Sequence, residues 1–143
     1  MRLVVDLTLP TDARLISQTR RMFSGYLAEL GVANDDVHDV ALALAEACTN
    51  VMRHAYDDPD HQCLHLTAEL RPEEVVLVVE DDGSGIPHGA GECMPEPGAT
   101  SGRGLQIIRE LMTSVDVETT PERAGTRVWM RKSLRAADLT APA

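Results

Sequence analysis

The chain has 143 residues, of which 43% are hydrophobic, and this length and composition predict one compact domain. Its formal net charge of −10 argues against a nucleic-acid-binding protein, because basic side chains supply most of the non-specific affinity for a phosphate backbone. The longest apolar runs are far too short to span a membrane and no signal-like segment follows Arg2, so we expect a soluble, cytoplasmic protein. Three cysteines without CxxC spacing indicate reduced thiols: Cys48, Cys63 and Cys93.

The first half of the chain predicts a strand followed by two helices. Residues 2–9 are rich in β-branched side chains and partly alternate, which is typical of a strand. Thr11 is the expected N-cap of a first amphipathic helix, whose apolar side chains recur at helical spacing until Gly31. A second amphipathic helix is expected over about 34–56.

The second half predicts a hairpin, a long loop, a third helix and two further strands. Segments 62–70 and 74–81 are separated by a tight turn, so they should pair antiparallel, and the valine-rich second segment should be central. Residues 82–101 are rich in glycine and proline and predict a mobile loop. A third helix is expected to begin near Gly102. Two segments with strand-like alternation follow, at 115–118 and 127–131.

This order of elements predicts an α+β two-layer sandwich, with helices packed on one face of a mixed, mostly antiparallel sheet. We expect one domain over residues 1–134, followed by a flexible C-terminal tail at 135–143. Arg20 and Arg21 on the first helix are expected to face solvent.

On the second helix, Glu46 and Asn50 are four residues apart, so both side chains should lie on one helix face. Arg53 and His54 continue that face one turn further on. A carboxylate and an amide together suggest a metal and phosphate site, because magnesium prefers hard oxygen ligands and needs few protein contacts when phosphates supply the rest. Asn50 is therefore the predicted magnesium ligand, and Glu46 remains free to act as a base. A solvated polar helix face is the structural alternative.

Two glycine motifs follow. Asp81 ends the most apolar strand and is followed by Gly83 and Gly85. A partly buried carboxylate needs hydrogen-bond donors such as an adenine amine, and glycines let the backbone pass close to a flat ring. Gly102 and Gly104 stand where a loop enters a helix, so exposed amides there would suit phosphate groups. A turn after a strand and a flexible helix entry are the plain alternatives for the two motifs.

Two further features are candidates for a site. Thr126, just before the last strand, offers a hydroxyl that would lie near the adenine. His61, Cys63 and His65 alternate along a predicted strand and could share a metal ion, although a tetrahedral site usually needs a fourth ligand.

Taken together, these segments resemble the ATP-binding fold (the Bergerat-type, histidine-kinase-like fold) shared by histidine kinases, type II topoisomerases and the Hsp90 chaperone. Within that superfamily, the chain is most similar to the small bacterial anti-sigma-factor serine/threonine kinases. The resemblance covers nearly the whole chain, to about Leu134. It rests on four matched segments: Glu46-Ala47-Cys48-Thr49-Asn50 with His54-Ala55-Tyr56, Asp81-Asp82-Gly83-Ser84-Gly85, Gly102-Arg103-Gly104-Leu105, and Gly125-Thr126.

The resemblance implies a role for each matched residue. Asn50 would coordinate magnesium, Asp81 would bind the adenine amine, and Glu46 would be the general base that takes a proton from a serine or threonine hydroxyl. The loop from Ile86 to Ser101 would be a lid that closes over ATP. The other implied nucleotide contacts are Arg53, His54, Gly83, Gly85, Ile86, Gly102, Arg103, Gly104, Leu105 and Thr126.

One position departs from the family pattern. Some members place an arginine just before the second glycine motif, where this chain has Ala99-Thr100-Ser101. The nearby arginine here is Arg103, between the glycines, and Arg53 is the other candidate for reaching the γ-phosphate.

The function that the resemblance implies is regulatory. It implies a kinase that uses ATP and Mg²⁺, sequesters a sigma factor, and phosphorylates an anti-anti-sigma antagonist of the STAS type, so that transcription is controlled by partner switching. It also implies a homodimer. The net charge and the short apolar runs argue against contact with nucleic acid or a membrane. A nucleotide-dependent binding module without phosphotransfer is the alternative.

Overall fold

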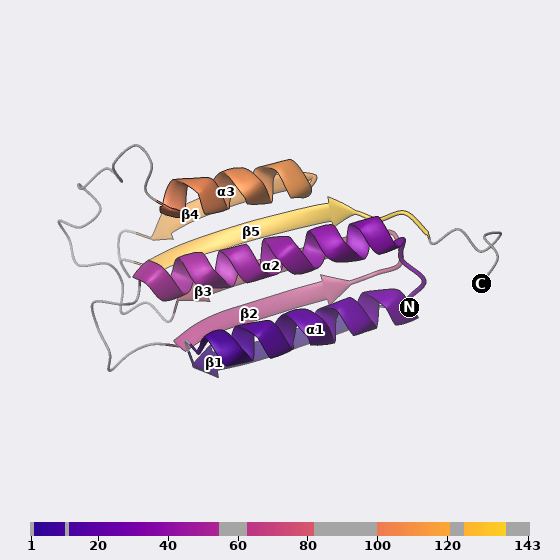
Figure 1. Cartoon of the computed structure of the whole chain (residues 1–143), viewed down its shortest axis with the longest axis horizontal. Coiled ribbons are helices and arrows are strands. Elements are labelled where there is room, and N and C mark those ends of the chain that lie inside the picture. Colours follow the sequence, from indigo (N-terminus) through magenta and orange to yellow (C-terminus); the bar gives the residue numbers. More distant parts are fainter. Residues whose placement is uncertain (1, 11, 55–62, 82–99, 121–124, 137–143) are drawn as a thin grey trace.

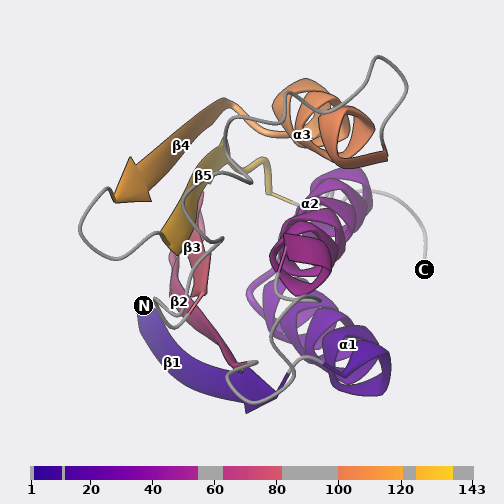
Figure 2. The ribbon, with the colours of Figure 1, turned by 90° about the vertical axis from the view of Figure 1, so that its left-hand side faces the viewer.

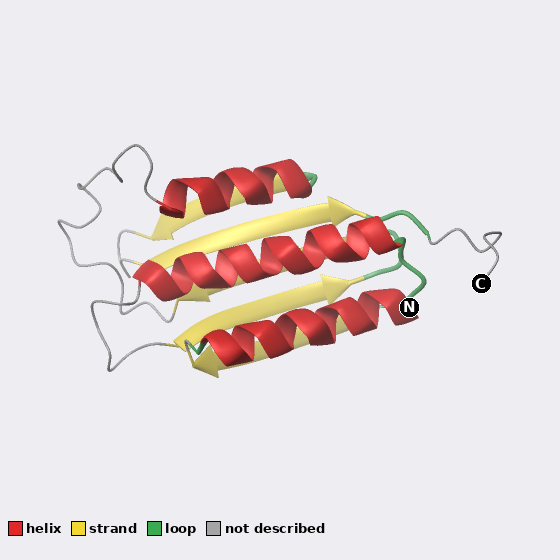
Figure 3. Ribbon diagram, viewed as in Figure 1, coloured by secondary structure: helices red, strands yellow, loops and turns green. Residues whose placement is uncertain are grey.

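The structure is a computed structural model that describes residues 2–10, 12–54, 63–81, 100–120 and 125–136. The described part forms a two-layer α+β sandwich in which the helices cover one face of a single sheet (Figures 1 and 3). The predicted fold class is therefore confirmed. In chain order the elements are β1 (Leu3–Pro10), α1 (Ala13–Glu29), α2 (Asn34–His54), β2 (Cys63–Leu70), β3 (Glu74–Asp81), α3 (Thr100–Leu111), β4 (Ser114–Thr120) and β5 (Gly125–Ser133).

The strand order of the sheet is β1-β2-β3-β5-β4, and each of its pairs is antiparallel. β3 is the central strand, as its valine-rich sequence predicted. A strand with neighbours on both sides has little contact with solvent and therefore favours apolar side chains. Its alternate residues Val75, Leu77 and Val79 are fully buried. The turn between β2 and β3 is closed by hydrogen bonds in both directions between the backbones of Arg71 and Glu74.

Helix α1 begins one residue later than the sequence suggested. The N-cap is Asp12, whose side chain accepts a hydrogen bond from the backbone N–H of Arg14 at 2.9 Å. Thr11, the predicted cap, is therefore wrong, since the carboxylate of the next residue takes that role. The helix ends as predicted, because Gly31 adopts a φ of 80° that a residue with a side chain rarely accepts.

One hydrophobic core fills the space between the helices and the sheet (Figure 2). Side chains along β2 alternate between buried and half-buried, so one face of the sheet packs on the helices and the other is left without a covering layer in the described part of the chain. The largest fully buried side chains are Phe23, Leu27, Leu44, Leu64, Leu66, Leu70, Leu77, Ile108 and Met130. No helix in the described residues is long and apolar enough to cross a membrane.

The chain leaves β5 and lies against the turn between α1 and α2. The backbone N–H of Ala33 donates to the carbonyl of Arg135 at 2.8 Å, and Val32 forms a β-bridge with Ala136. The predicted end of the domain at Leu134 stays a prediction, and residues 137–143 lie outside the described part. Arg20 and Arg21 are exposed on α1, as expected.

Candidate functional site

Helix α2 carries the first predicted motif. Its buried apolar side chains recur every three or four residues and pack on the core, which fixes the rotation of the helix about its axis. Asn50 is a polar exception, because it is only 6% exposed. Glu46, one turn earlier, is half-buried. A buried amide is costly unless it finds polar partners, so its surroundings indicate what the site can hold.

Gly104 on α3 lies directly against the side chain of Asn50. A Cβ atom added to Gly104 would lie 2.8 Å from Asn50 Oδ1, 3.0 Å from Nδ2 and 3.2 Å from Cγ. Real Cβ atoms essentially never approach other atoms as closely as the first of these distances, so a larger residue at position 104 would force the buried Asn50 side chain or the helices to shift. The contact joins the first and the last of the three main predicted motifs, which are 54 positions apart in the sequence.

The elements that carry the remaining site residues end or begin at the same end of the sandwich. In Figure 1, the last turn of α2, the end of β3, the first turn of α3 and the start of β5 all lie at the left-hand end. Asp81 is the last residue of β3, and its backbone pairs with Leu64. Thr126 is half-buried near the start of β5. The fold thus gathers four segments that are far apart in the sequence.

Several predicted site residues are only partly described. Gly83, Gly85 and Ile86 lie outside the described residues, as does the predicted lid up to residue 99. The structure describes the helical backbone, without the side chains, at Arg53, His54 and Arg103, and Gly102 is likewise helical. Leu105 is half-buried and packs against the hydrophobic core.

The predicted His61–Cys63–His65 metal constellation gains no support. Within the described residues, no group of three histidine, cysteine or acidic side chains could hold a metal ion. His61 lies outside those residues. His65 Nε2 instead forms a short contact with Asp6 Oδ1 on the neighbouring strand β1.

Burial separates the chemical roles of Glu46 and Cys48 within the first motif. Cys48 is fully buried, and burial raises the pKa of its thiol to about 12, which keeps the thiol protonated and unreactive at neutral pH. Glu46 is only half-buried and so remains the residue of the motif that can exchange a proton with a bound molecule.

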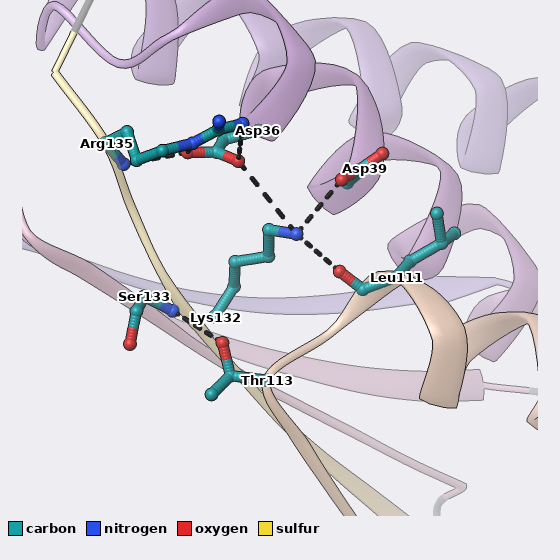
Figure 4. A network of polar contacts seen from close by, with 7 residues as sticks. All are labelled: Asp36, Asp39, Leu111, Thr113, Lys132, Ser133 and Arg135. Carbon is teal, nitrogen blue, oxygen red and sulfur yellow. Dashed lines mark hydrogen bonds and ion pairs between the residues drawn. The ribbon is translucent and has the colours of Figure 1, made fainter.

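A polar network that the sequence did not predict lies at the opposite end of the helices, where Lys132 contacts both α2 and α3 (Figure 4). A signal for it exists in the sequence. Val128, Met130 and Lys132 alternate along β5, so the lysine occupies a position on the covered face of the sheet. A charge there is costly unless it is paired, and its partners come from elements that only the fold brings together.

Comparison with known proteins covers nearly the whole chain. Residues 9–132 match the model of the histidine kinase-like ATPase domain. A serine-protein kinase RsbW from Halalkalibacterium halodurans is 29% identical over 140 residues, which cover 92% of this chain and 83% of the relative. An anti-sigma F factor from Clostridium novyi is 30% identical over 125 residues, which cover 84% of this chain and 87% of the relative.

A solved structure supports the same fold. The crystal structure of the RsbU and RsbW domains of Rv1364c from Mycobacterium tuberculosis matches 96% of this chain with a TM-score of 0.70 and 20% sequence identity. The present chain spans 35% of that longer chain.

Proposed function

Because this chain belongs to the histidine kinase-like ATPase family and, within it, to the bacterial anti-sigma-factor serine-protein kinases, we propose that it transfers the γ-phosphoryl group of ATP to a serine or threonine of an anti-anti-sigma protein. It is an ATP-dependent protein kinase that controls transcription by partner switching. The observation that carries the site is the contact between Gly104 and Asn50, since it assembles two of the motifs around one buried amide.

The residues around Asn50 fit a magnesium-bound nucleotide. The amide oxygen is a hard ligand of the kind that magnesium prefers, and a site of this type needs only one or two protein ligands. Gly104 has no side chain to cover that amide, and the amides of the first turn of α3 suit an anionic group. Bound Mg²⁺ would neutralise charge on the phosphates, and Asn50 would hold it.

Glu46 is the proposed general base. Its half-buried carboxylate takes the proton from the hydroxyl of the acceptor residue, and that oxygen then forms a bond to the γ-phosphorus. The bond from the γ-phosphorus to the bridging oxygen breaks and ADP leaves. Little covalent chemistry falls to the protein in such a transfer, so the positions of Glu46 and Asn50 on one rigid helix matter most.

The other proposed nucleotide contacts come from the segments that begin or end at the same end of the sandwich. We assign adenine recognition to Asp81 with Gly83, Gly85 and Ile86, and phosphate contacts to Gly102 and Arg103. Four residues complete the set of proposed contacts: Arg53, His54, Leu105 and Thr126. The lid that the sequence predicted over 86–101 is now proposed over residues 86–99, because α3 begins at Thr100.

The proposed partners are a sigma factor, which the chain sequesters, and the anti-anti-sigma protein that releases it, with the exchange taking place in the cytoplasm. Relatives named anti-sigma F factor support the first partner. Relatives named serine-protein kinase support phosphorylation of the second.

The chain is also proposed to form a homodimer, and the uncovered face of the sheet is the surface that suits a second copy. Four arginines there pair with four glutamates, namely Arg2 and Arg71 with Glu69, Arg127 with Glu80 and Glu118, and Arg131 with Glu74. Trp129, 49% exposed, lies among these pairs. These arginines neutralise the four glutamates, so two such faces would repel each other less than surfaces that carry more of the net charge of −10.

Replacement of Glu46 tests the proposed chemistry. Glu46→Gln keeps the shape of the side chain and removes the base, so phosphorylation of an anti-anti-sigma protein by labelled ATP should fall at least about 100-fold. The dissociation constant for Mg-ATP, measured by calorimetry, should stay within about twofold, because Asn50 and the glycine motifs are intact. Glu29→Gln makes the same chemical change on exposed α1 and should alter neither quantity.

Other outcomes decide between kinase and binding module. Unchanged phosphorylation by the Glu46→Gln variant would remove Glu46 as the base. A wild-type protein that binds Mg-ATP and its partner but yields no phosphoprotein would establish a nucleotide-dependent binding module instead.

A further inference from the structure

Lys132 joins α2 and α3 at the end of the molecule opposite Asn50. Its ammonium Nζ lies 2.5 Å from the carbonyl oxygen of Leu111, the last residue of α3, and 3.0 Å from Asp39 Oδ2 on α2 (Figure 4). The nearest oxygen of Asp36 is 4.0 Å away, which makes a longer ion pair. The Lys132 side chain is only 14% exposed. One buried ammonium group therefore contacts both helices at once.

The residue type at this position suits that geometry. Lys132 is the only lysine in the sequence, whereas the other twelve of the thirteen basic residues are arginines. A compact ammonium has three donors that can point to different partners, whereas a planar guanidinium favours side-on pairing with one carboxylate. Arg135, the next basic residue along the chain, makes such a pair with Asp36 through two nitrogen atoms.

The position of α3 depends on a few directional contacts. The backbone of α3 lies closer to α2 than to the strands of the sheet. Apolar packing such as that of Ile108 sets which face of α3 points to the core, but it is non-directional and leaves room for small shifts of the helix along its neighbour. More specific contacts act at the two ends of the pair: the close approach of Gly104 to Asn50 at one end, and the directional polar contacts of Lys132 at the other. Just after the helix, Thr113 is held by backbone and side-chain bonds to β5.

We propose that Lys132 is a positioning residue for the nucleotide site, because it fixes α3 against α2 so that Gly104 stays on Asn50. This inference rests on the proposed function, since it assumes that the Asn50–Gly104 contact forms the nucleotide site. Lys132 touches no bound molecule itself. Its contact with Asp39 lies roughly 16 Å along α2 from Asn50, so its influence passes through the relative position of two rigid helices.

The variant Lys132→Met tests the proposal, because it keeps an unbranched apolar side chain and removes both directional contacts. Asp36 keeps Arg135, and Asp39 has access to water, so the chain should still fold. We expect the amides of residues 104–111 to exchange with deuterium at least about tenfold faster without nucleotide. We also expect Mg-ATP to bind about tenfold more weakly in calorimetry.

A control separates positioning from a general loss of stability. Ile16→Val removes one methyl group from the core beneath α1, far from both ends of α3. At a temperature where both variants are fully folded, Ile16→Val should change neither exchange in α3 nor Mg-ATP affinity. Asp39→Ala is the second test variant: it frees α2 but leaves the bond to Leu111, and should show a smaller effect of the same kind.

Each outcome has a distinct meaning. Normal exchange in α3 and unchanged Mg-ATP affinity in Lys132→Met would overturn the role of Lys132. If the wild-type protein and its variants all fail to bind Mg-ATP, the proposed function fails. The deuterium exchange of α3 in Lys132→Met then still decides whether Lys132 fixes this helix.

Discussion

Gly104 on α3 lies directly against Asn50 on α2, and its replacement by alanine should harm both stability and nucleotide binding. The added Cβ would lie 2.8 Å from Asn50 Oδ1, so either the amide moves or the helices separate. Overpacking typically costs about 1–3 kcal/mol, whereas the better helix propensity of alanine returns up to about 1 kcal/mol. We therefore expect Gly104→Ala to lower the free energy of unfolding by about 1 kcal/mol and Mg-ATP affinity by about tenfold, measured by urea titration and calorimetry.

A second helical glycine provides the matched control. Gly25 is exposed on α1, and nothing lies within 4 Å of a Cβ atom added there. Gly25→Ala should therefore raise the free energy of unfolding by roughly 0.5–1 kcal/mol and leave Mg-ATP affinity unchanged. Equal responses of the two variants would show that the contact with Asn50 does not constrain position 104.

Between elements, the ion pair of Asp36 with Arg135 ties α2 to the segment after β5 and should make the fold sensitive to acid. Asp36 Oδ2 accepts from the backbone N–H of Arg135 at 2.7 Å, and Oδ1 accepts from Nη2 at 3.0 Å. Burial alone would raise the pKa of Asp36, but the hydrogen bonds and charge of Arg135 outweigh it, so this pKa lies below the ordinary value. The stabilisation is therefore complete above about pH 5, where both folded and unfolded aspartates are charged, and is lost as pH falls below about 4.

Asp36→Asn isolates that contribution. At neutral pH the free energy of unfolding of this variant should be about 2 kcal/mol lower than that of the wild type, because a neutral amide is a weaker partner for Arg135 than the buried carboxylate. The difference should shrink as pH falls below about 4, when the wild-type carboxylate is also neutralised. Asp35→Asn removes the same charge from the exposed neighbouring position and should change stability little. A difference that stays constant from pH 7 to pH 3 would contradict the assignment.

Sequence patterns predicted the helices and strands well where local signals determine their type and position. The helical spacing of apolar residues located α1 and α2, and the valine-rich run correctly predicted β3 as the central strand. The cap of α1 was misassigned because Thr11 and Asp12 are both good cap residues, and only the path of the chain out of β1 chooses between them. The Lys132 network was missed because its partners are 21 and 93 positions away, which no local pattern connects.

The candidate site was predictable as a set of motifs but not as a contact. Glycines at a helix entry have a plain structural explanation, and the sequence offered no reason to place Gly104 against Asn50 rather than beside a loop. The crossing of α2 and α3 supplies that reason. The fold thereby adds a contact between two motifs to what the sequence offered, and this contact supports the proposed site.

For the molecule as a whole, the two layers divide the available surface by chemistry. The proposed nucleotide site is at one end of the sandwich, and the sheet face that the helices leave uncovered is a separate surface (Figure 2). Trp129 belongs to that surface, because it alternates along β5 with the buried Val128 and Met130. Across the sheet, Trp129 is paired with Val78 on β3 and Asp116 on β4. An exposed tryptophan among neutralised charges is typical of an association surface. Because two identical faces related by a twofold axis present the same groups to each other, such a surface suits a homodimer.

Trp129→Glu tests this arrangement by placing an unpaired negative charge in that face. We expect sedimentation to show a wild-type dimer at micromolar concentrations and at least about tenfold weaker association in the variant, since two added charges would face each other across the twofold axis. Trp129 is the only tryptophan in the chain, so wild-type fluorescence should shift to shorter wavelength as the dimer forms.

The comparison variant is Gln18→Glu, which adds the same charge to the exposed side of α1 and should leave association unchanged. Mg-ATP affinity should be preserved in both variants, because Trp129 is on the uncovered face of the sheet and Gln18 is on the exposed side of α1. A wild-type protein that stays monomeric, or a Trp129→Glu variant that dimerises normally, would contradict the use of this face. In the second case the dimer must form through the helix layer or an edge strand, where the net negative charge of the chain opposes association.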